Sequence, residues 1–237
     1  MSRYIATLTA ILCAGCVFAG TASAATPPTV PSLFTRPGEL LGNTLRFRGA
    51  LQAEQAGRTL QIQRQQPDGT WTQTATAVVA PDGSFLARWR TDEIGSFAVR
   101  ALLAGAEAQA ADASALTTTV TVYRPARATW FGPGFYGKRT ACGQVMSHAL
   151  LGVAHRSLPC GTPVALFLGD KSITVPVIDR GPFANGAHYD LTSAAAKVVG
   201  MTQTSTIGVV PQRGAQMAPP VLAPPPYAGT GGATPTP

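Results

Sequence analysis

Two aspartates, Asp179 and Asp190, have the residue type and position that best suit acid–base chemistry in this chain. Asp179 directly follows a short apolar run at 175–178, and Arg180 and a Gly-Pro pair come next. An apolar run that stops at Gly-Pro predicts a buried strand ending in a turn, so both side chains are expected at a rim. Asp190 follows eleven residues after Asp179. Of two such carboxyl groups, one can protonate a glycosidic oxygen and the other can stabilise the positive charge that develops on the sugar as the bond breaks.

A histidine and several aromatic residues accompany the two carboxylates. His155 lies in the loop region before a Pro-Cys pair, and Trp130, Phe131 and Tyr136 open the same part of the chain. Aromatic rings stack on the faces of sugars, and a histidine can position substrate or relay protons. Together with the carboxylates, these residues predict a groove for a polysaccharide.

Each of these residues also has a purely structural interpretation. Asp179 and Arg180 can form an ion pair that braces a turn, which is a common surface feature. Asp190 precedes an Ala-rich stretch and is predicted to be the N-cap of a short helix. A single histidine such as His155 is more often structural than catalytic.

The composition limits the classes of partner. The chain has 237 residues and a net charge of +7, but its 18 Lys and Arg residues are scattered singly or in pairs. Nucleic-acid binding usually requires a clustered basic face, so we expect no nucleic-acid partner. A mildly basic protein of this kind is better suited to an anionic polymer of the cell envelope.

The N-terminus has the pattern of a signal peptide, residues 1–24. Arg3 precedes an apolar run at 4–19, and Ala-Ser-Ala at 22–24 is a small-residue cleavage site. We therefore expect export to the periplasm, the cell wall or the medium, no membrane span after signal removal, and a monomer. Lipidation of Cys16 is the alternative that we rank below simple export.

Two cysteines stay in the mature chain, Cys142 and Cys160, and an even pair in an exported protein predicts a disulfide. The alternative is a zinc site with His148 and His155, but the spacing lacks the close pairs typical of zinc ligands. The G-x-G-x-x-G match at 132–137 lacks the following helix and acidic residue of a dinucleotide site. We expect neither a metal nor a cofactor.

The first half of the mature chain predicts an antiparallel, Ig-like β-sandwich. After a leader at 25–41, residues 42–123 contain six short strand patterns separated by turn signals such as Pro-Asp-Gly. The aromatic residues Trp71 and Trp89 suit its core. Residues 124–127 are predicted to be a hinge.

Residues 128–211 predict a second domain. A hairpin is expected about Gly169 and Asp170, with a helix starting at Asp190 and stopping at Gly200, and a final strand at 205–210. The Pro/Ala/Gly-rich residues 212–237 show no core-forming pattern, which predicts a disordered tail.

The second domain closely resembles the RlpA-like (rare lipoprotein A) family, which is related to expansins. The resemblance rests on ordered blocks: ATWFGPGFYG (128–137), TACG (140–143), AHRSLPCGT (154–162), DRGPF (179–183) and DLT (190–192). It implies a six-stranded double-psi β-barrel with one short helix. It also implies lytic transglycosylase activity, which cuts peptidoglycan glycan strands that lack stem peptides.

The resemblance also implies roles for single residues. The family's histidine falls on His155 and its aspartate before Arg-Gly-Pro falls on Asp179, while the expansin-type aspartate falls on Asp190. The family's glutamate is replaced by Gln144, whose amide cannot exchange a proton. Cysteines 142 and 160 stand where serine and phenylalanine are commoner, which supports a disulfide between these two blocks.

Our leading hypothesis is an exported, endolytic lytic transglycosylase of the RlpA type acting on peptidoglycan. Asp179 would protonate the glycosidic oxygen, while His155 and Asp190 position substrate or relay protons. Substrate contacts are expected from Trp130, Phe131, Tyr136, Gln144 and Arg180. The alternative is a non-catalytic, expansin-like module that binds wall polysaccharide, and a weaker third hypothesis is a secreted inhibitor or effector.

Overall fold

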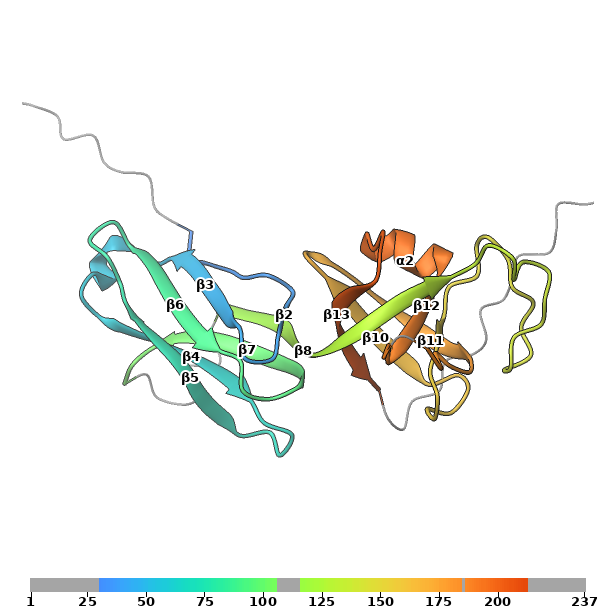
Figure 1. Cartoon of the computed structure of the whole chain (residues 1–237). Coiled ribbons are helices and arrows are strands. Elements are labelled where there is room, and N and C mark those ends of the chain that lie inside the picture. The colour runs from blue at the N-terminus through green and yellow to red at the C-terminus, as the bar shows by residue number, and fades with distance from the viewer. Residues whose placement is uncertain (1–29, 106–115, 185, 213–237) are drawn as a thin grey trace, which may run out of the picture.

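The computed structural model describes residues 30–105, 116–184 and 186–212. The predicted signal peptide and nearly all of the predicted tail lie outside these ranges. The described residues form two lobes, which share one long strand (Figure 1). No helix in the described ranges is long and apolar enough to cross a membrane.

The N-terminal lobe is a β-sandwich. Its strands are β1 (Ser32–Phe34), β2 (Gly38–Leu40), β3 (Thr44–Ala50), β4 (Thr59–Gln65), β5 (Trp71–Val78), β6 (Ser84–Arg90), β7 (Gly95–Leu103) and the first half of β8 (Leu116–Phe131), with a short 3-10 helix at Ala53–Gln55. One sheet has the order β1-β3-β6, and the other runs β5-β4-β7-β8, with β2 parallel to β8.

Strict alternation of apolar and polar residues builds this lobe. Along β3, Leu45 and Phe47 are buried while Arg46 and Arg48 are exposed. Since successive side chains of a strand point to opposite faces, one face enters the core and the other meets water. The predicted sandwich and its six strands are confirmed, and Trp89 lies in the core as expected. The segment predicted as a leader contributes two further strands, β1 and β2. The sequence did not reveal them because each is only three residues long and follows a Pro/Thr-rich stretch.

Strand β8 joins the two lobes. Its residues 116–122 pair with β7, and residues 124–128 pair with β13 (Ser205–Pro211). The segment predicted as a hinge, 124–127, is therefore continuous strand and not a loop. Pro125 indicated a loop, but its fixed φ is compatible with an extended chain. The domain limits suggested by the sequence stay a proposal, because β8 belongs to both lobes.

The C-terminal lobe is a closed, six-stranded barrel, which confirms the fold that the resemblance implied. The second half of β8 is joined by β9 (Val153–Ala154), β10 (Pro163–Leu168), β11 (Lys171–Asp179), β12 (Tyr189–Thr192) and β13. The order is β12-β9-β11-β10-β13-β8, and pairing of β12 with β8 closes the barrel. Two of the pairings, β9 with β11 and β12 with β8, are parallel. The barrel core is mainly aliphatic.

The helix α2 (Ser193–Val199) begins later than predicted. Thr192 is its N-cap, and the Thr192 hydroxyl accepts a hydrogen bond from the backbone N–H of Ala195 at 3.2 Å. The predicted cap, Asp190, lies instead in β12, because its pairing with β8 keeps it extended. Gly200 ends the helix in the left-handed conformation at φ 78°, as expected.

The lobes also touch beside β8. The rings of Tyr123 and Phe167 stack at 4.7 Å between centroids, and both side chains are buried. Arg36 of the sandwich pairs with Asp170 of the barrel at 2.7 Å and donates to the carbonyl of Gly169. Asp170 sits in the β10–β11 hairpin turn, which confirms the hairpin predicted there.

Candidate active site

A groove of about 460 Å³ opens where β8, β11 and β12 end. Both candidate carboxylates line it, with aromatic residues and the turn after β11 around them. The lining residues are Thr129, Trp130, Phe131, Phe135, Ala154, Asp179, Arg180, Gly181, Pro182, Phe183, Ala184, Asp190 and Thr204. The barrel thus brings together the two aspartates that the sequence singled out.

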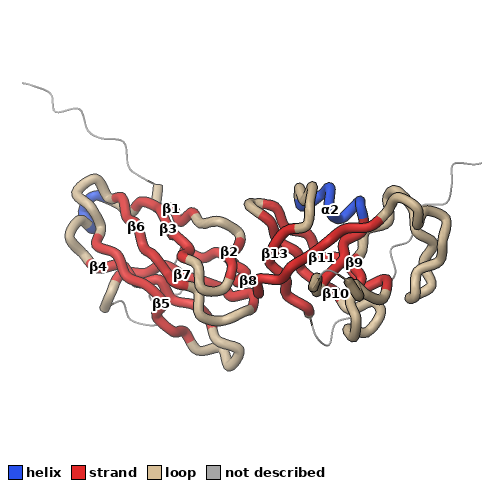
Figure 2. The backbone as a smooth tube through the Cα atoms, in the orientation of Figure 1, coloured by secondary structure: helices blue, strands red, loops and turns tan. Residues whose placement is uncertain are grey.

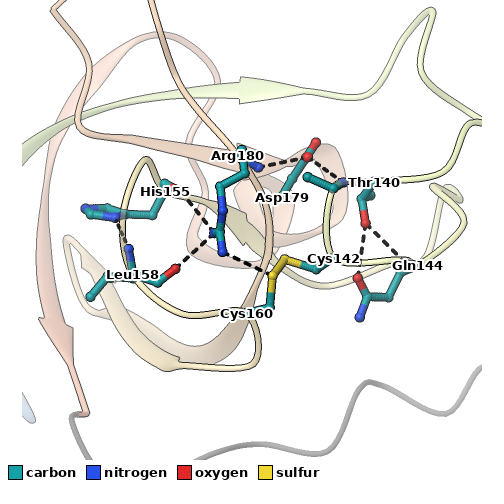
Figure 3. Close-up of a disulfide and its surroundings, with 9 residues drawn as sticks. Thr140, Cys142, Gln144, His155, Leu158, Cys160, Asp179 and Arg180 are labelled. Atoms are coloured by element: carbon teal, nitrogen blue, oxygen red, sulfur yellow. Dashed lines mark hydrogen bonds between the residues drawn. A yellow bond between two sulfur atoms is a disulfide. The ribbon is translucent and has the colours of Figure 1, made fainter.

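Backbone N–H groups hold Asp179 in place at the end of β11. Its Oδ1 accepts hydrogen bonds from the N–H of Ala141 at 2.9 Å and of Arg180 at 2.8 Å (Figure 3). The backbone carbonyl of the same residue accepts from the N–H of His155 at 3.2 Å. The carboxylate is therefore fixed by two loops that meet at the strand end.

Asp190, near the start of β12, is half-buried. Burial raises the pKa of Asp190, and the nearby Asp179 carboxylate also raises it, while a hydrogen bond from Thr129 lowers it. The Thr129 hydroxyl donates to Oδ1 of Asp190 at 2.8 Å. Burial and the neighbouring negative charge both disfavour the charged form of Asp190, so this carboxyl stays protonated to a higher pH than an ordinary aspartate.

Arg180 does not pair with Asp179, contrary to the ion-pair interpretation. Its guanidinium donates to the carbonyl of Leu158 at 2.9 Å, to the carbonyl of His155 at 3.4 Å and to Sγ of Cys160 at 3.2 Å. Figure 3 shows this side chain lying against the loop of His155 and Cys160. Because its donors point into that loop, the guanidinium braces the loop more than it offers contacts to a ligand.

The disulfide Cys142–Cys160 is formed, with the two Cα atoms 5.7 Å apart. It joins the loop that holds Asp179 through Ala141 to the loop that Arg180 braces (Figure 3). The alternative zinc site is therefore wrong, since both thiols are consumed and His148 stacks on a tyrosine instead. Within the described ranges, no group of three or more His, Cys, Asp or Glu residues could hold a metal ion.

His155 lies beside the groove and is not among the residues that line it. Its Nδ1 accepts from the N–H of Ser157 at 3.2 Å and of Leu158 at 3.0 Å, so a neutral ring carries its proton on Nε2. Burial, followed by the charge of Arg180, lowers the pKa of His155. The ring packs on Tyr189 at 4.8 Å. These contacts describe a neutral ring that shapes its loop.

Two other predicted contacts also fall outside the groove lining. The side-chain oxygen of Gln144 accepts a hydrogen bond from the hydroxyl of Thr140 at 3.1 Å, within its own turn. The hydroxyl of Tyr136 bonds to the hydroxyl of Ser193 at 3.0 Å, and its ring stacks on His148 at 3.7 Å. The amide at position 144 therefore stabilises the turn whose Ala141 N–H binds Asp179.

More aromatic residues line the groove than the sequence predicted, because Phe135 and Phe183 join Trp130 and Phe131. Trp130 and Phe131 line the groove as expected, and the rings of Phe131 and Phe135 meet edge to face at 5.8 Å. Phe183 is the most exposed of the lining aromatics, at 79%. Its position directly after the Gly-Pro turn was the available signal, since a large apolar residue at a rim indicates contact with a ligand.

Comparisons with known proteins find matches to the barrel lobe. Residues 125–212 match the family model described as lytic transglycolase. The chain is similar to a probable endolytic peptidoglycan transglycosylase RlpA of Synechocystis sp., with 37% identity over 124 residues, 47% of this chain and 38% of the relative.

Two further relatives cover the barrel. The endolytic peptidoglycan transglycosylase RlpA of Campylobacter jejuni is 39% identical over 84 residues, 35% of this chain and 30% of the relative. A probable enzyme of the same name from Aquifex aeolicus is 41% identical over 86 residues, 35% of this chain and 37% of the relative. The chain thus spans less than two fifths of the length of each of these relatives.

Proposed function

The C-terminal lobe, matched at residues 125–212, belongs to the RlpA-like double-psi β-barrel family, and we propose that it is an endolytic lytic transglycosylase. Its substrate would be the glycan strand of peptidoglycan, and the protein would act after export, in the periplasm or at the cell wall. Three relatives that carry this activity in their names support the substrate class.

The observation that carries the proposal is the pair of carboxyl groups in the groove. Asp190 has a raised pKa, caused first by burial, and Asp179 stands close enough to raise it further. Glycoside cleavage needs a carboxylic acid that is still protonated near the working pH and a second carboxylate beside the reacting sugar. The groove supplies both, from β11 and β12, the two strands that flank β9 in the barrel.

We assign the proton donor to Asp190, which reverses the hypothesis drawn from the sequence. The Asp190 carboxyl gives its proton to the glycosidic oxygen as the bond from that oxygen to C1 breaks. The resulting Asp190 carboxylate then takes the proton from the 6-hydroxyl of the sugar whose C1 loses the glycosidic oxygen. The 6-oxygen attacks C1 and closes a 1,6-anhydro ring, so that no water is consumed.

Asp179 is assigned the stabilising role. Its Oδ1 is already occupied by the N–H groups of Ala141 and Arg180, which fix the carboxylate in one orientation. A fixed negative charge beside the sugar stabilises the positive charge that develops at C1 in the transition state. Trp130, Phe131 and Phe183 would stack on the sugars along the groove.

Two of the roles expected from the sequence become indirect ones. His155 would keep the loop before the disulfide in shape through its Nδ1, and Arg180 would hold that loop from the other side. Gln144 is not among the residues that line the groove, but its turn also carries the Ala141 N–H that holds Asp179, so it would act through that turn. The activity in the names of the three relatives favours cleavage over the non-catalytic, polysaccharide-binding alternative.

The test is product analysis on glycan strands freed of stem peptides. The mature protein should release 1,6-anhydro ends, and Asp190→Asn should reduce their rate of formation by about 100- to 10,000-fold, the usual contribution of a general acid. Asp68→Asn, which changes an exposed turn in the sandwich, is the matched control and should keep full activity. Binding to the strands without anhydro products from the wild type would refute the proposal and favour a binding module.

A further inference from the structure

An arginine cluster covers the outer face of the β1-β3-β6 sheet in the sandwich lobe. It consists of Arg46 and Arg48 on β3 with Arg88 and Arg90 on β6, and we call it the arginine face. All four side chains alternate with buried core residues and are exposed. Their separation in the sequence made these charges look scattered, whereas β3 and β6 lie side by side in one sheet (Figure 2), which brings the four positions to the same face.

The strand register fixes the layout of this face. Arg46 lies directly opposite Arg88, and Thr44 lies opposite Arg90. Opposite residues of antiparallel strands have Cβ atoms about 5 Å apart. Alternate residues along one strand are about 7 Å apart. The four arginines therefore form a row along the two strands, in which Arg46 and Arg88 face one another directly.

No carboxylate of the described residues forms an ion pair with the arginine face. The ion pairs of the described residues involve Arg36 and Arg64, and none includes an arginine of the face. The nearby carboxylate of Glu39 is occupied by Arg36, Asn43 and a backbone N–H. Like charges that face one another across strands, as Arg46 and Arg88 do, weaken a sheet. Four exposed arginines without an ion-pair partner among the described residues suit a surface that meets external anions.

A hollow beside the arginine face indicates that the anion carries sugar rings as well as charge. It measures about 310 Å³ and is lined by Phe34, Thr35, Arg36, Glu39, Thr44, Arg46 and Arg48. Phe34 is 68% exposed and lies directly opposite Arg48 in the register of β1 with β3. An exposed ring can stack on the face of a sugar, hydroxyls can bond to its hydroxyls, and guanidinium groups bind carboxylates or phosphates with two N–H donors.

We propose that the arginine face binds an acidic polysaccharide, a glycan chain that carries a carboxylate or phosphate on its repeating units. The anionic groups pair with the four arginines, and one sugar ring stacks on Phe34. This surface lies on the sandwich and not on the barrel, so the inference does not depend on cleavage by the barrel. It gives the N-terminal lobe a function of its own, which is to hold the protein on an anionic glycan.

The test uses polygalacturonate, which carries one carboxylate on each sugar, with neutral dextran as its counterpart. Titration calorimetry should detect binding of the mature chain to polygalacturonate and not to dextran, with an affinity that falls as salt is added. Replacing all four arginines by glutamine should weaken binding by at least about ten-fold, since each exposed charge pair contributes a few-fold at most.

Two controls separate this surface from general charge. Arg58→Gln combined with Arg127→Gln removes two exposed arginines elsewhere, and Arg46→Gln combined with Arg88→Gln removes the same charge from the face. The face pair should weaken binding several-fold more than the distant pair, and its thermal stability should be unchanged or higher because a repulsion is lost. Equal weakening by both pairs would overturn the proposal. So would a wild type that binds anionic vesicles or an oligonucleotide but not polygalacturonate.

Discussion

The two lobes use the same strand, β8, but arrange their chemistry in opposite ways. In the sandwich, β8 pairs with β7 and lies in an open sheet, and the outer face of the other sheet carries charge across its flat surface. In the barrel, β8 pairs with β13 and β12, and the sheet closes on itself. A closed sheet turns its inner face into the core, and here the two carboxylates lie near strand ends, where loops surround a groove.

This difference explains why carboxylates and arginines are segregated. Asp179 and Asp190 lie at the ends of β11 and β12, where turns and loops surround them and burial raises the pKa of Asp190. The four arginines of the arginine face alternate with buried core residues along β3 and β6 and are exposed. Catalysis needs a perturbed acid in a partly dry groove, whereas attachment to a polyanion needs accessible, unperturbed charge.

The largest effects should come from truncating a core side chain in one lobe, which should destabilise that lobe and leave the other intact. Phe47→Ala in the sandwich should lower the free energy of unfolding by about 3–5 kcal/mol, because Phe47 is fully buried and leaves a cavity. Leu166→Ala in the barrel, also fully buried, should cost about 2–5 kcal/mol. The cores are separate clusters, so hydrogen exchange measured by mass spectrometry should show opening mainly in the altered lobe. Equal opening of both lobes would mean that β8 makes them one folding unit.

The pattern of apolar residues made most of the fold predictable. Alternation along 44–49 and 59–64 and the Pro-Asp-Gly turns identified the sandwich, and the block order at 128–192 identified the barrel. The start of α2 was missed because Asp190 and Thr192 are both good N-caps, and only the pairing of β12 with β8 decides between them. The same kind of long-range pairing made the predicted hinge a strand.

The site was predictable only in part, since sequence gives residue type but not direction. Asp179, Asp190, Trp130 and Phe131 meet in the groove as expected. The roles of His155, Gln144 and Arg180 depended on where their side chains point, and each bonds within a loop. The arginine face was missed for a related reason, because its members are adjacent only through the β3–β6 register.

The disulfide should matter to the barrel and not to the sandwich. Replacing Cys142 and Cys160 together by serine should lower the stability of the barrel by about 3 kcal/mol in the chain-entropy model. Activity should fall as well, because the released loop carries the Ala141 N–H that fixes Asp179. Calorimetry should show a lower melting temperature for the barrel and an unchanged transition for the sandwich. An unchanged barrel transition would show that hydrogen bonds alone hold the two loops together.

A carboxyl change should have opposite effects on stability in the two lobes. The folded-state pKa of Asp190 is raised above its ordinary value of 3.8, so ionising Asp190 opposes folding as the pH rises through that raised value. Asp190→Asn should therefore raise the melting temperature at pH 7, and the gain should vanish once the pH falls below about 3.8. Wild-type activity should also decline as the pH rises through the pKa of Asp190.

The control for this prediction is Asp82→Asn in the sandwich. Hydrogen bonds from Ser84 lower the pKa of Asp82, which is the opposite direction. The loss of this carboxylate should leave the melting temperature at pH 7 unchanged or lower. Melting curves of both variants from pH 3 to pH 8 check the sign, and a gain from Asp82→Asn equal to that from Asp190→Asn would contradict the role of burial.

The smallest effect should come from the ion pair between the lobes. Arg36 and Asp170 are 48% and 79% exposed, and exposed pairs are worth about 0.2–1 kcal/mol and weaken in salt. Arg36→Ala should therefore lower stability by less than about 1 kcal/mol, and salt should remove the difference. Tyr123→Ala should cost several times more, because Tyr123 is buried and stacked on Phe167. Scattering profiles of both variants would then show whether packing, and not charge, fixes how the sandwich and the barrel face one another. A larger change in Arg36→Ala would assign that role to charge.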